Sequence, residues 1–144
     1  MVKEKLIVSA CFLNDGYKYD GTNNKNEKII ALGEKYDFIP VCPEVFGGLK
    51  TPRIPSEQLG DKVMMIDGTD VTEAFYNGAL KSLMLAKQNG VTKAILKARS
   101  PSCGKGYIYD GTFSHTLING NGVFAQMALD AGIKIYTEDE IEEL

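Results

Sequence analysis

Residues 6–11 read LIVSAC, a short apolar run that ends in a cysteine. Three similar runs follow along the chain: FIPVC at 38–42, AILKA at 94–98 and IKIY at 133–136. Short runs rich in β-branched and aromatic residues predict strands, and the segments between them show the helical spacing of apolar residues. Because strands that alternate with helices are joined by right-handed crossovers, this pattern predicts a parallel sheet.

Four segments are predicted to be helical, at residues 23–36, 72–89, about 120–131 and from 137 onward. In the second of them, Thr72 is placed as the N-cap and Gly90 as the residue that ends the helix. Thr137 and Glu140 have the spacing of a capping box. The predicted fold class is therefore α/β, with residues 1–144 forming a single domain. Its open parallel sheet carries helices on both faces, as in Rossmann-like or flavodoxin-like proteins.

Four segments depart from this regular alternation. Asp67-Gly68 and Asp110-Gly111 lie between short apolar stretches and predict small hairpin insertions near the rim of the site. Residues 46–59 contain glycines and prolines without a regular period, so they are predicted to form an ordered excursion or lid. The GNG at 120–122 predicts either a tight connection into a helix or a turn whose following amides could receive an anionic group.

Composition and charge limit the class of protein. Apolar residues make up 44% and charged residues 24% of the sequence, as in ordinary globular proteins. A net charge of −3 disfavours a nucleic acid polymer as partner. No apolar run approaches the roughly 18 residues that span a bilayer, and the N-terminus resembles a strand rather than a signal peptide. We therefore expect a cytoplasmic protein that acts on a small molecule, without a membrane partner.

The three cysteines fall at or just after the ends of predicted strands. Cys11 ends the first, Cys42 ends the second, and Cys103 lies a few residues past the third. The carboxyl ends of parallel strands meet along one rim, where open α/β proteins bind ligands. Three thiols can therefore converge there, and a [4Fe–4S] cluster held by three cysteines keeps one iron without a protein ligand. That iron can bind a substrate.

Other interpretations of the cysteines stay open. Each one alone could be a core residue at the end of a strand. A structural zinc ion usually has four ligands, commonly from CxxC pairs, and no such pair occurs here. A cysteine nucleophile paired with the only histidine, His115, would leave two cysteines unexplained, and we interpret His115 as a surface residue. A non-catalytic iron–sulfur or zinc-binding sensor or carrier is the alternative to an enzyme.

Seven motifs lie along nearly the whole chain: SACF, YDG at 19–21, CPEVFGGLKTPRIPSE, DGTDVTEAF at 67–75, KARSPSCG, GYIYDGTFS at 106–114 and NGNGVFA. Together they resemble a bacterial and archaeal family that includes the thiouracil desulfidases. The resemblance implies an oxygen-labile [4Fe–4S] cluster on the matching residues Cys11, Cys42 and Cys103. It also implies that Glu44 of the CPE motif and Ser100, the first serine of SPSC, act in catalysis.

The residues beside the cysteines agree with such roles. Glu44 lies two residues after Cys42, so on extended backbone its side chain points to the same side as the thiol. The ordinary alternative is a loop carboxylate that faces solvent. Pro101 makes the RSPSC segment stiff, which holds the hydroxyls of Ser100 and Ser102 in place. We predict that Ser102 either contacts the substrate or only satisfies backbone groups.

Further polar residues have weaker signals. Asp20 is a predicted substrate contact, and Arg53 either orients a pyrimidine edge or packs the segment 46–59. Lys97 and Arg99 alternate along the third predicted strand, where the ordinary explanation is either snorkelling of the long side chains or an ion pair at the strand end.

The predicted activity is non-redox removal of sulfur from a thiolated pyrimidine, which yields the oxo compound and hydrosulfide. The open iron is expected to bind the thiocarbonyl sulfur, and water then attacks the ring carbon. Glu44 is expected to accept the proton of that water, and Ser100 to hydrogen-bond the substrate or the attacking oxygen. The iron–sulfur assembly machinery is expected to be a partner, because the cluster must be loaded.

Overall fold

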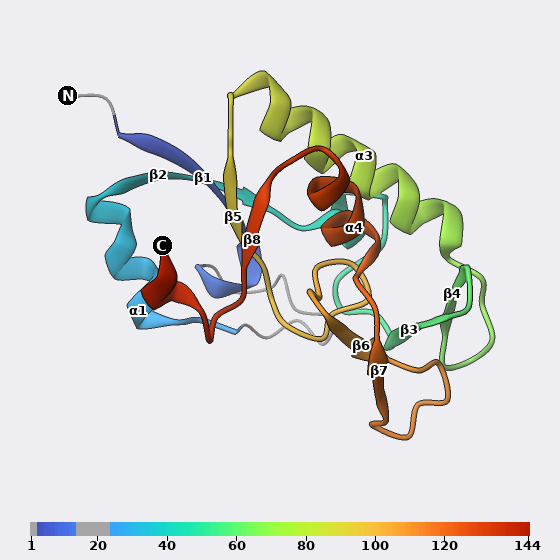
Figure 1. Ribbon diagram of the computed structural model, residues 1–144. Coiled ribbons are helices and arrows are strands. Elements are labelled where there is room, and N and C mark those ends of the chain that lie inside the picture. The colour runs from blue at the N-terminus through green and yellow to red at the C-terminus, as the bar shows by residue number, and fades with distance from the viewer. Residues whose placement is uncertain (1–2, 14–23) are drawn as a thin grey trace.

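The computed structural model describes residues 3–13 and 24–144, and its centre is a parallel sheet. The four strands are β1 (Glu4–Ser9), β2 (Tyr36–Val41), β5 (Lys93–Ile95) and β8 (Lys134–Tyr136). They lie in the order β2-β1-β5-β8, as Figure 1 shows. Numbered among themselves, these strands have the order 2-1-3-4 of flavodoxin-like sheets, which confirms the predicted fold class. The order reverses between β1 and β5, and this is where such sheets bind ligands.

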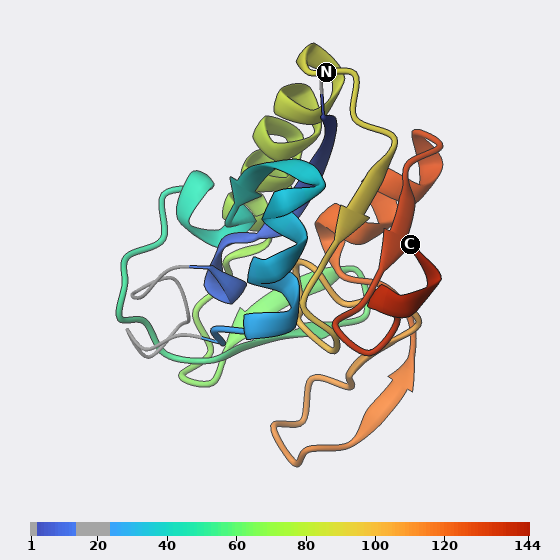
Figure 2. The ribbon, with the colours of Figure 1, turned by 90° about the vertical axis from the view of Figure 1, so that its left-hand side faces the viewer.

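Helices cover both faces of the sheet. On one face, α3 (Thr72–Gln88) and α4 (Val123–Asp130) pack against Ile7 of β1 and its neighbours. On the other face, Leu6 and Val8 pack with Ile29 of α1 (Glu27–Ala31) and with the C-terminal 3-10 turn Ile141–Glu143. Figure 1 shows α1 on one side of the sheet and α3 and α4 on the other, and in Figure 2 the side with α1 faces the viewer. Successive residues of a strand face opposite sides, so the buried LIV run of β1 serves both cores.

The first predicted helix is shorter than expected. Residues 23–36 were expected to form one helix, but α1 begins after Asn26, whose side chain accepts a hydrogen bond from Ile29 N at 3.1 Å. It gives way to the 3-10 turn Leu32–Glu34, and Tyr36 already belongs to β2. Gly33 lies in that turn, and its low helix propensity accounts for the early end.

The bounds of the other helices agree more closely with those predicted from the sequence. Helix α3 begins at Thr72, and its N-cap is Val71 rather than Thr72 as predicted. The Thr72 hydroxyl does not cap the helix but accepts a hydrogen bond from Val63 N at 2.9 Å. Gly90 has a φ of 65° and ends the helix as predicted. Thr137 N donates to Glu140 Oε1 at 3.0 Å, which is half of the expected capping box, but only one 3-10 turn follows it.

Two antiparallel hairpins lie outside the parallel sheet. They pair β3 (Ser56–Leu59) with β4 (Lys62–Met65), and β6 (Tyr107–Tyr109) with β7 (Leu117–Asn119). Asp110-Gly111 opens the loop of the second hairpin, as predicted. Asp67-Gly68 also lies in a turn with antiparallel pairing across it, as predicted, because Met64 and Asp70 form an antiparallel bridge. The turn that joins β3 to β4, at Gly60 and Asp61, was not predicted from the sequence. Both hairpins lie beyond the carboxyl ends of the strands, as Figures 1 and 2 show.

Candidate active site

A cavity of about 460 Å³ lies at the carboxyl ends of β1, β2 and β5, where the strand order reverses. It is lined by all of the described residues that the sequence singled out for chemistry: Cys11, Cys42, Glu44, Arg53, Ser100, Ser102 and Cys103. A cavity of this size accommodates a small molecule. Asp20, the remaining predicted substrate contact, lies outside the residues that the structure describes. No helix in the described part of the chain is long and apolar enough to cross a membrane.

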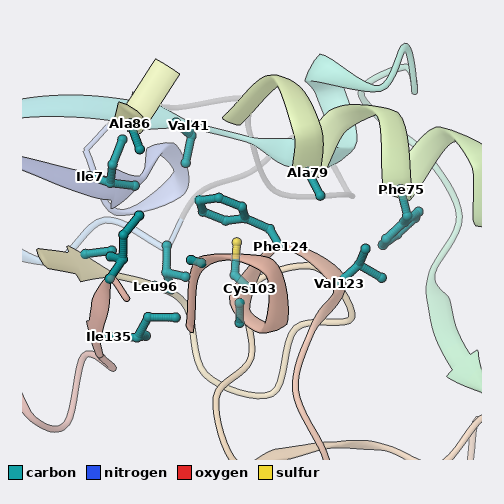
Figure 3. Close-up of a cluster of buried hydrophobic side chains, with 14 of the residues drawn as sticks. Ile7, Val41, Phe75, Ala79, Ala86, Leu96, Cys103, Val123, Phe124 and Ile135 are labelled. Carbon is teal, nitrogen blue, oxygen red and sulfur yellow. The ribbon is translucent and has the colours of Figure 1, made fainter. Parts of the chain in front are cut away.

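Each cysteine enters the cavity from a different segment. Cys11 lies in a 3-10 turn, Ala10–Phe12, because β1 ends at Ser9 and not at the cysteine as expected. Cys42 is the first residue after β2 and the N-cap of α2 (Pro43–Phe46). Cys103 is 5% exposed and lies among the core side chains that include Phe124 (Figure 3). Its surroundings therefore resemble those of a core cysteine, although it also lines the cavity.

The three thiols influence one another electrostatically. Burial raises the pKa of each above its ordinary value, and the pKa of Cys103 reaches about 12. A negative charge on Cys42 raises the pKa of Cys11 further, and charges on both raise that of Cys103. The Asn24 side chain partly opposes the rise at Cys11 by hydrogen bonding. A cationic metal centre would reverse these shifts, because coordination deprotonates a thiol.

The donor set fits a cluster better than a single ion. Among residues 3–13 and 24–144, no three His, Cys, Asp or Glu side chains converge closely enough to hold one metal ion. The thiols instead surround a cavity with room for a larger group. Three cysteines of this kind match the ligands of a [4Fe–4S] cluster that keeps one iron open.

A chain of hydrogen bonds passes through Glu44. Arg53 Nε donates to Glu44 Oε1 at 3.0 Å, and Ser102 Oγ donates to Glu44 Oε2 at 3.0 Å. The Glu44 side chain is 14% exposed and that of Arg53 is 5% exposed, so solvent screens this ion pair only weakly. Arg53 also donates to the Lys50 carbonyl at 3.3 Å and to Thr51 Oγ1 at 2.9 Å. Arg53 therefore ties the segment 46–59 to the carboxylate.

Ser100 and Ser102 have different partners. Ser100 Oγ accepts hydrogen bonds from Ser102 N at 3.2 Å and from Cys103 N at 3.1 Å, so it stabilises the turn that carries Cys103. The two hydroxyl oxygens are 3.0 Å apart. Because Ser102 donates to Glu44, its oxygen is left as the acceptor for the Ser100 hydroxyl. Ser102, rather than Ser100, is the serine in direct contact with the carboxylate.

Helix α4 anchors the SPSC loop. Val123 N donates to the Pro101 carbonyl and Phe124 N to the Ser102 carbonyl, both at 2.9 Å. The first amides of this helix are therefore already bonded, and of the two interpretations of the GNG turn the tight connection is correct. Gly122 allows the close approach, because a Cβ there would collide with the backbone of Ser102 and Cys103.

Lys97 and Arg99 lie beyond β5, which ends at Ile95, and not along it as expected. The predicted ion pair at this strand end is present, between Lys97 Nζ and Glu138 Oε2 at 2.7 Å. Both Lys97 and Arg99 also line the cavity.

Three other lining residues, Tyr109, Phe113 and His115, were not among the site residues predicted from the sequence. His115 is exposed, as interpreted, yet it lies at the edge of the cavity with Tyr109 and Phe113. A GTFSH segment after Asp110 is an ordinary hairpin loop by composition. Only the path of the β6–β7 hairpin brings these rings to the cysteines.

Comparison with known proteins agrees with this site. Residues 6–140 match the model of the 2-thiouracil desulfurase family. The chain is 38% identical over 149 residues to the uncharacterized protein YbbK of Bacillus subtilis (strain 168), with 96% of this chain and 99% of that protein covered. It is also similar to a solved structure described as the [4Fe–4S]-dependent thiouracil desulfidase TudS (DUF523Vcz). The TM-score is 0.91, with 41% sequence identity, and the match covers 99% of this chain and 95% of that one.

Proposed function

Because this chain belongs to the 2-thiouracil desulfurase family, we propose that it is a [4Fe–4S]-dependent desulfidase that converts a thiolated pyrimidine to its oxo compound and hydrosulfide. The observation that carries the proposal is the single cavity that gathers three cysteines, Glu44 and the SPSC loop at the reversal point of the sheet. The cofactor agrees with the description of the solved relative that is 41% identical to this chain.

Cys11, Cys42 and Cys103 are the residues that would hold the cluster. When bound, the cluster supplies a soft Lewis-acid iron without a protein ligand, suited to a thiocarbonyl sulfur. The protein contributes the cavity around that sulfur and the groups that move protons beside it.

Glu44 is the base in this proposal. The oxygen of a water molecule forms a bond to the ring carbon, and its proton goes to the Glu44 carboxylate. The carbon–sulfur bond then breaks as the second proton of that water passes to the sulfur, which leaves as hydrosulfide. The carbon keeps its oxidation state, so the reaction needs no external oxidant or reductant. Arg53 holds Oε1, which fixes the direction in which the carboxylate faces.

The serines connect the base to the cysteine loop. The Ser100 hydroxyl donates to Ser102, and Ser102 donates to Glu44 Oε2. These hydrogen bonds connect the Glu44 carboxylate to the loop that carries Cys103, whose Sγ lies 3.7 Å from Ser102 Oγ. In this proposal Ser100 acts by orienting Ser102, because its own hydroxyl is occupied by Ser102 Oγ and by the amides of Ser102 and Cys103. Ser102 Oγ keeps one lone pair, which can accept a hydrogen bond from the attacking water.

The setting of the reaction follows from its chemistry. We place it in the cytoplasm, where reducing conditions keep the thiols available for the cluster. The substrate partner is a small thiolated molecule, and the iron–sulfur assembly machinery is the proposed partner for loading.

Anaerobic reconstitution with iron and sulfide, followed by incubation with 2-thiouracil or 4-thiouracil, tests the proposal. We expect uracil and hydrosulfide in equal amounts, without an added reductant. Glu44→Gln should keep the cluster absorbance and lose turnover by about 100-fold or more, as expected for a general base. A fully loaded protein that releases no sulfide would contradict the proposal, and unchanged behaviour of Glu44→Gln would favour a sensor or carrier.

A further inference from the structure

We propose that the loop of the β6–β7 hairpin, residues 110–116, is the wall that recognises the planar ring of the substrate. Phe113 is the residue that stacks on the ring, and Glu57 is the residue that positions Phe113. This recognition loop deepens the proposed function, on which it rests, because it assigns the surface that binds the heterocycle whose sulfur is removed.

Unusual backbone conformations coincide with the cavity. In the described residues, the non-glycine positions with positive φ are Arg99 at 65°, Phe113 at 57° and His115 at 59°. All three line the cavity. A left-handed backbone is unfavourable for an aromatic residue and persists only where the surroundings hold it, which happens most often at ligand sites. A glycine would adopt the backbone conformation of Phe113 with less strain. The presence of an aromatic residue at this position therefore indicates that its side chain has a function.

Glu57 supplies the contacts that hold this conformation. Its side chain lies in the interior, with the residue 9% exposed, and Oε1 accepts hydrogen bonds from Gly111 N at 3.0 Å and Phe113 N at 3.1 Å. Hydrogen bonds from amides to a carboxylate are stronger than those between neutral groups. The next residue, Gln58, donates to the Pro101 carbonyl at 3.0 Å. Strand β3 therefore fixes the position of the recognition loop relative to the SPSC loop.

The recognition loop adds aromatic side chains to a cavity whose other lining residues are cysteines, polar residues and aliphatic residues. The rings of Tyr109 and His115 meet edge to face with centroids 5.9 Å apart, and both line the cavity beside Phe113. Aromatic side chains stack on pyrimidines through their π faces, and this attraction does not depend on the exocyclic sulfur. The loop should therefore bind the oxo product as well as the thiolated substrate.

The sulfur-free product uracil is the probe that separates recognition from chemistry. Its binding to the anaerobic holoenzyme is measured by isothermal titration calorimetry, together with KM and kcat for 2-thiouracil. We expect Phe113→Ala to raise both the uracil Kd and the KM about tenfold, the usual effect of removing one stacked ring, with kcat within about twofold. The matched control is Tyr107→Ala, which removes an exposed ring from the same hairpin outside the cavity lining and should change neither constant.

Two further comparisons exclude a purely structural role. Phe113→Gly removes the ring and also relieves the left-handed backbone, so it should melt above Phe113→Ala while it binds uracil just as weakly. Glu57→Gln should weaken uracil binding in the wild-type background. In the Phe113→Ala background it should add little further loss, because the ring that Glu57 positions is already absent.

Each failure has its own signature. Three results would contradict the proposed role of the recognition loop. They are uracil binding by the Phe113→Ala holoenzyme within twofold of wild type, no uracil binding by wild type, and an equal loss of binding in Tyr107→Ala. If wild type still releases sulfide in those cases, the proposed desulfidase stands. If wild type releases no sulfide yet loses uracil binding with Phe113→Ala, the desulfidase is wrong and the recognition loop stands.

Discussion

At the scale of single residues, the Glu44 carboxylate has a separate partner for each oxygen, with Arg53 on Oε1 and Ser102 on Oε2. Two partners on different segments restrict the rotation of the side chain. A base that must face a water molecule beside a metal centre benefits from this restriction, because misplacement of a catalytic group by about 1 Å can lower the rate 100-fold.

Arg53→Lys is predicted to lower kcat about 10- to 100-fold, since it removes a charge-assisted hydrogen bond that contributes about 1.5–3 kcal/mol. The cluster should remain, because Arg53 is not one of its ligands. Steady-state kinetics and the iron content of the same preparation check this. Lys50→Ala, an exposed cation in the same segment, is the control and should keep its activity. Full activity in Arg53→Lys would show that Ser102 alone orients Glu44.

Glu138 provides a prediction about pH. Burial by itself would raise the pKa of its carboxyl, but hydrogen bonds from Lys97 and Ala98 N and the charge of Lys97 outweigh it and leave the pKa below its ordinary value. A folded-state pKa below the unfolded value stabilises the protein above about pH 5, and this stabilisation is lost as the pH falls through the folded-state pKa.

Glu138→Gln should therefore lower stability at pH 7 by about 1–2 kcal/mol, and the difference from wild type should shrink as the pH approaches 4. Thermal unfolding across this range measures it. The exposed Glu142→Gln serves as the matched carboxylate control, with an expected change of less than about 0.5 kcal/mol. A difference that stays constant with pH would mean that the Glu138 charge is not what stabilises the strand end.

At the scale of elements, two glycines set the position of α2 against α3. A Cβ on Gly78 of α3 would collide with the Pro43 carbonyl, and one on Gly47 would collide with the Ala74 carbonyl. Helix α2 is only four residues long; it begins directly after Cys42 and carries Glu44. The backbone contact with α3 therefore places both the proposed base, Glu44, and the Cys42 thiol.

Gly78→Ala is predicted to destabilise the protein by about 1–3 kcal/mol through overpacking, and to reduce cluster occupancy because α2 must move. Denaturant unfolding and iron analysis report the two effects. Asn77→Ala changes an exposed neighbour in the same helix and should leave occupancy unchanged. Normal iron content in a stable Gly78→Ala protein would show that α2 tolerates the shift.

At the scale of the whole molecule, the three proposed ligands join segments far apart in the sequence. A group bound to all three ties β1, β2 and the loop after β5 together, and ligands that bind only the folded state stabilise it. Removal of the cluster should therefore lower the Tm, while the core residues that are buried on both faces of the sheet keep the apoprotein folded.

Cys103→Ala tests this coupling. We expect a lower iron content than in wild type and no difference in Tm before and after anaerobic reconstitution, whereas wild type should gain several degrees. Circular dichroism under anaerobic conditions measures both proteins. A stable cluster of unchanged stoichiometry in Cys103→Ala would remove Cys103 from the ligand set.

The sequence by itself determined the parallel sheet and the meeting of the cysteines. Apolar runs such as LIVSAC predict strands from their own residues, and the carboxyl ends of parallel strands must share a rim, so Cys11, Cys42 and Cys103 converge without knowledge of any side-chain contact. Glu44 and Ser100 were predicted to be catalytic because motifs beside the cysteines resemble those of a known family.

Only the tertiary structure decided how the polar groups pair. Ser102 meets Glu44 across 58 positions of sequence, and Glu57 meets the amide of Phe113 across 56. Such partners depend on the paths of the hairpins and on the close backbone contacts at Gly78 and Gly122. Local periodicity carries no information about these paths, because a side-chain hydrogen bond forms only after packing has brought two distant loops within about 3 Å.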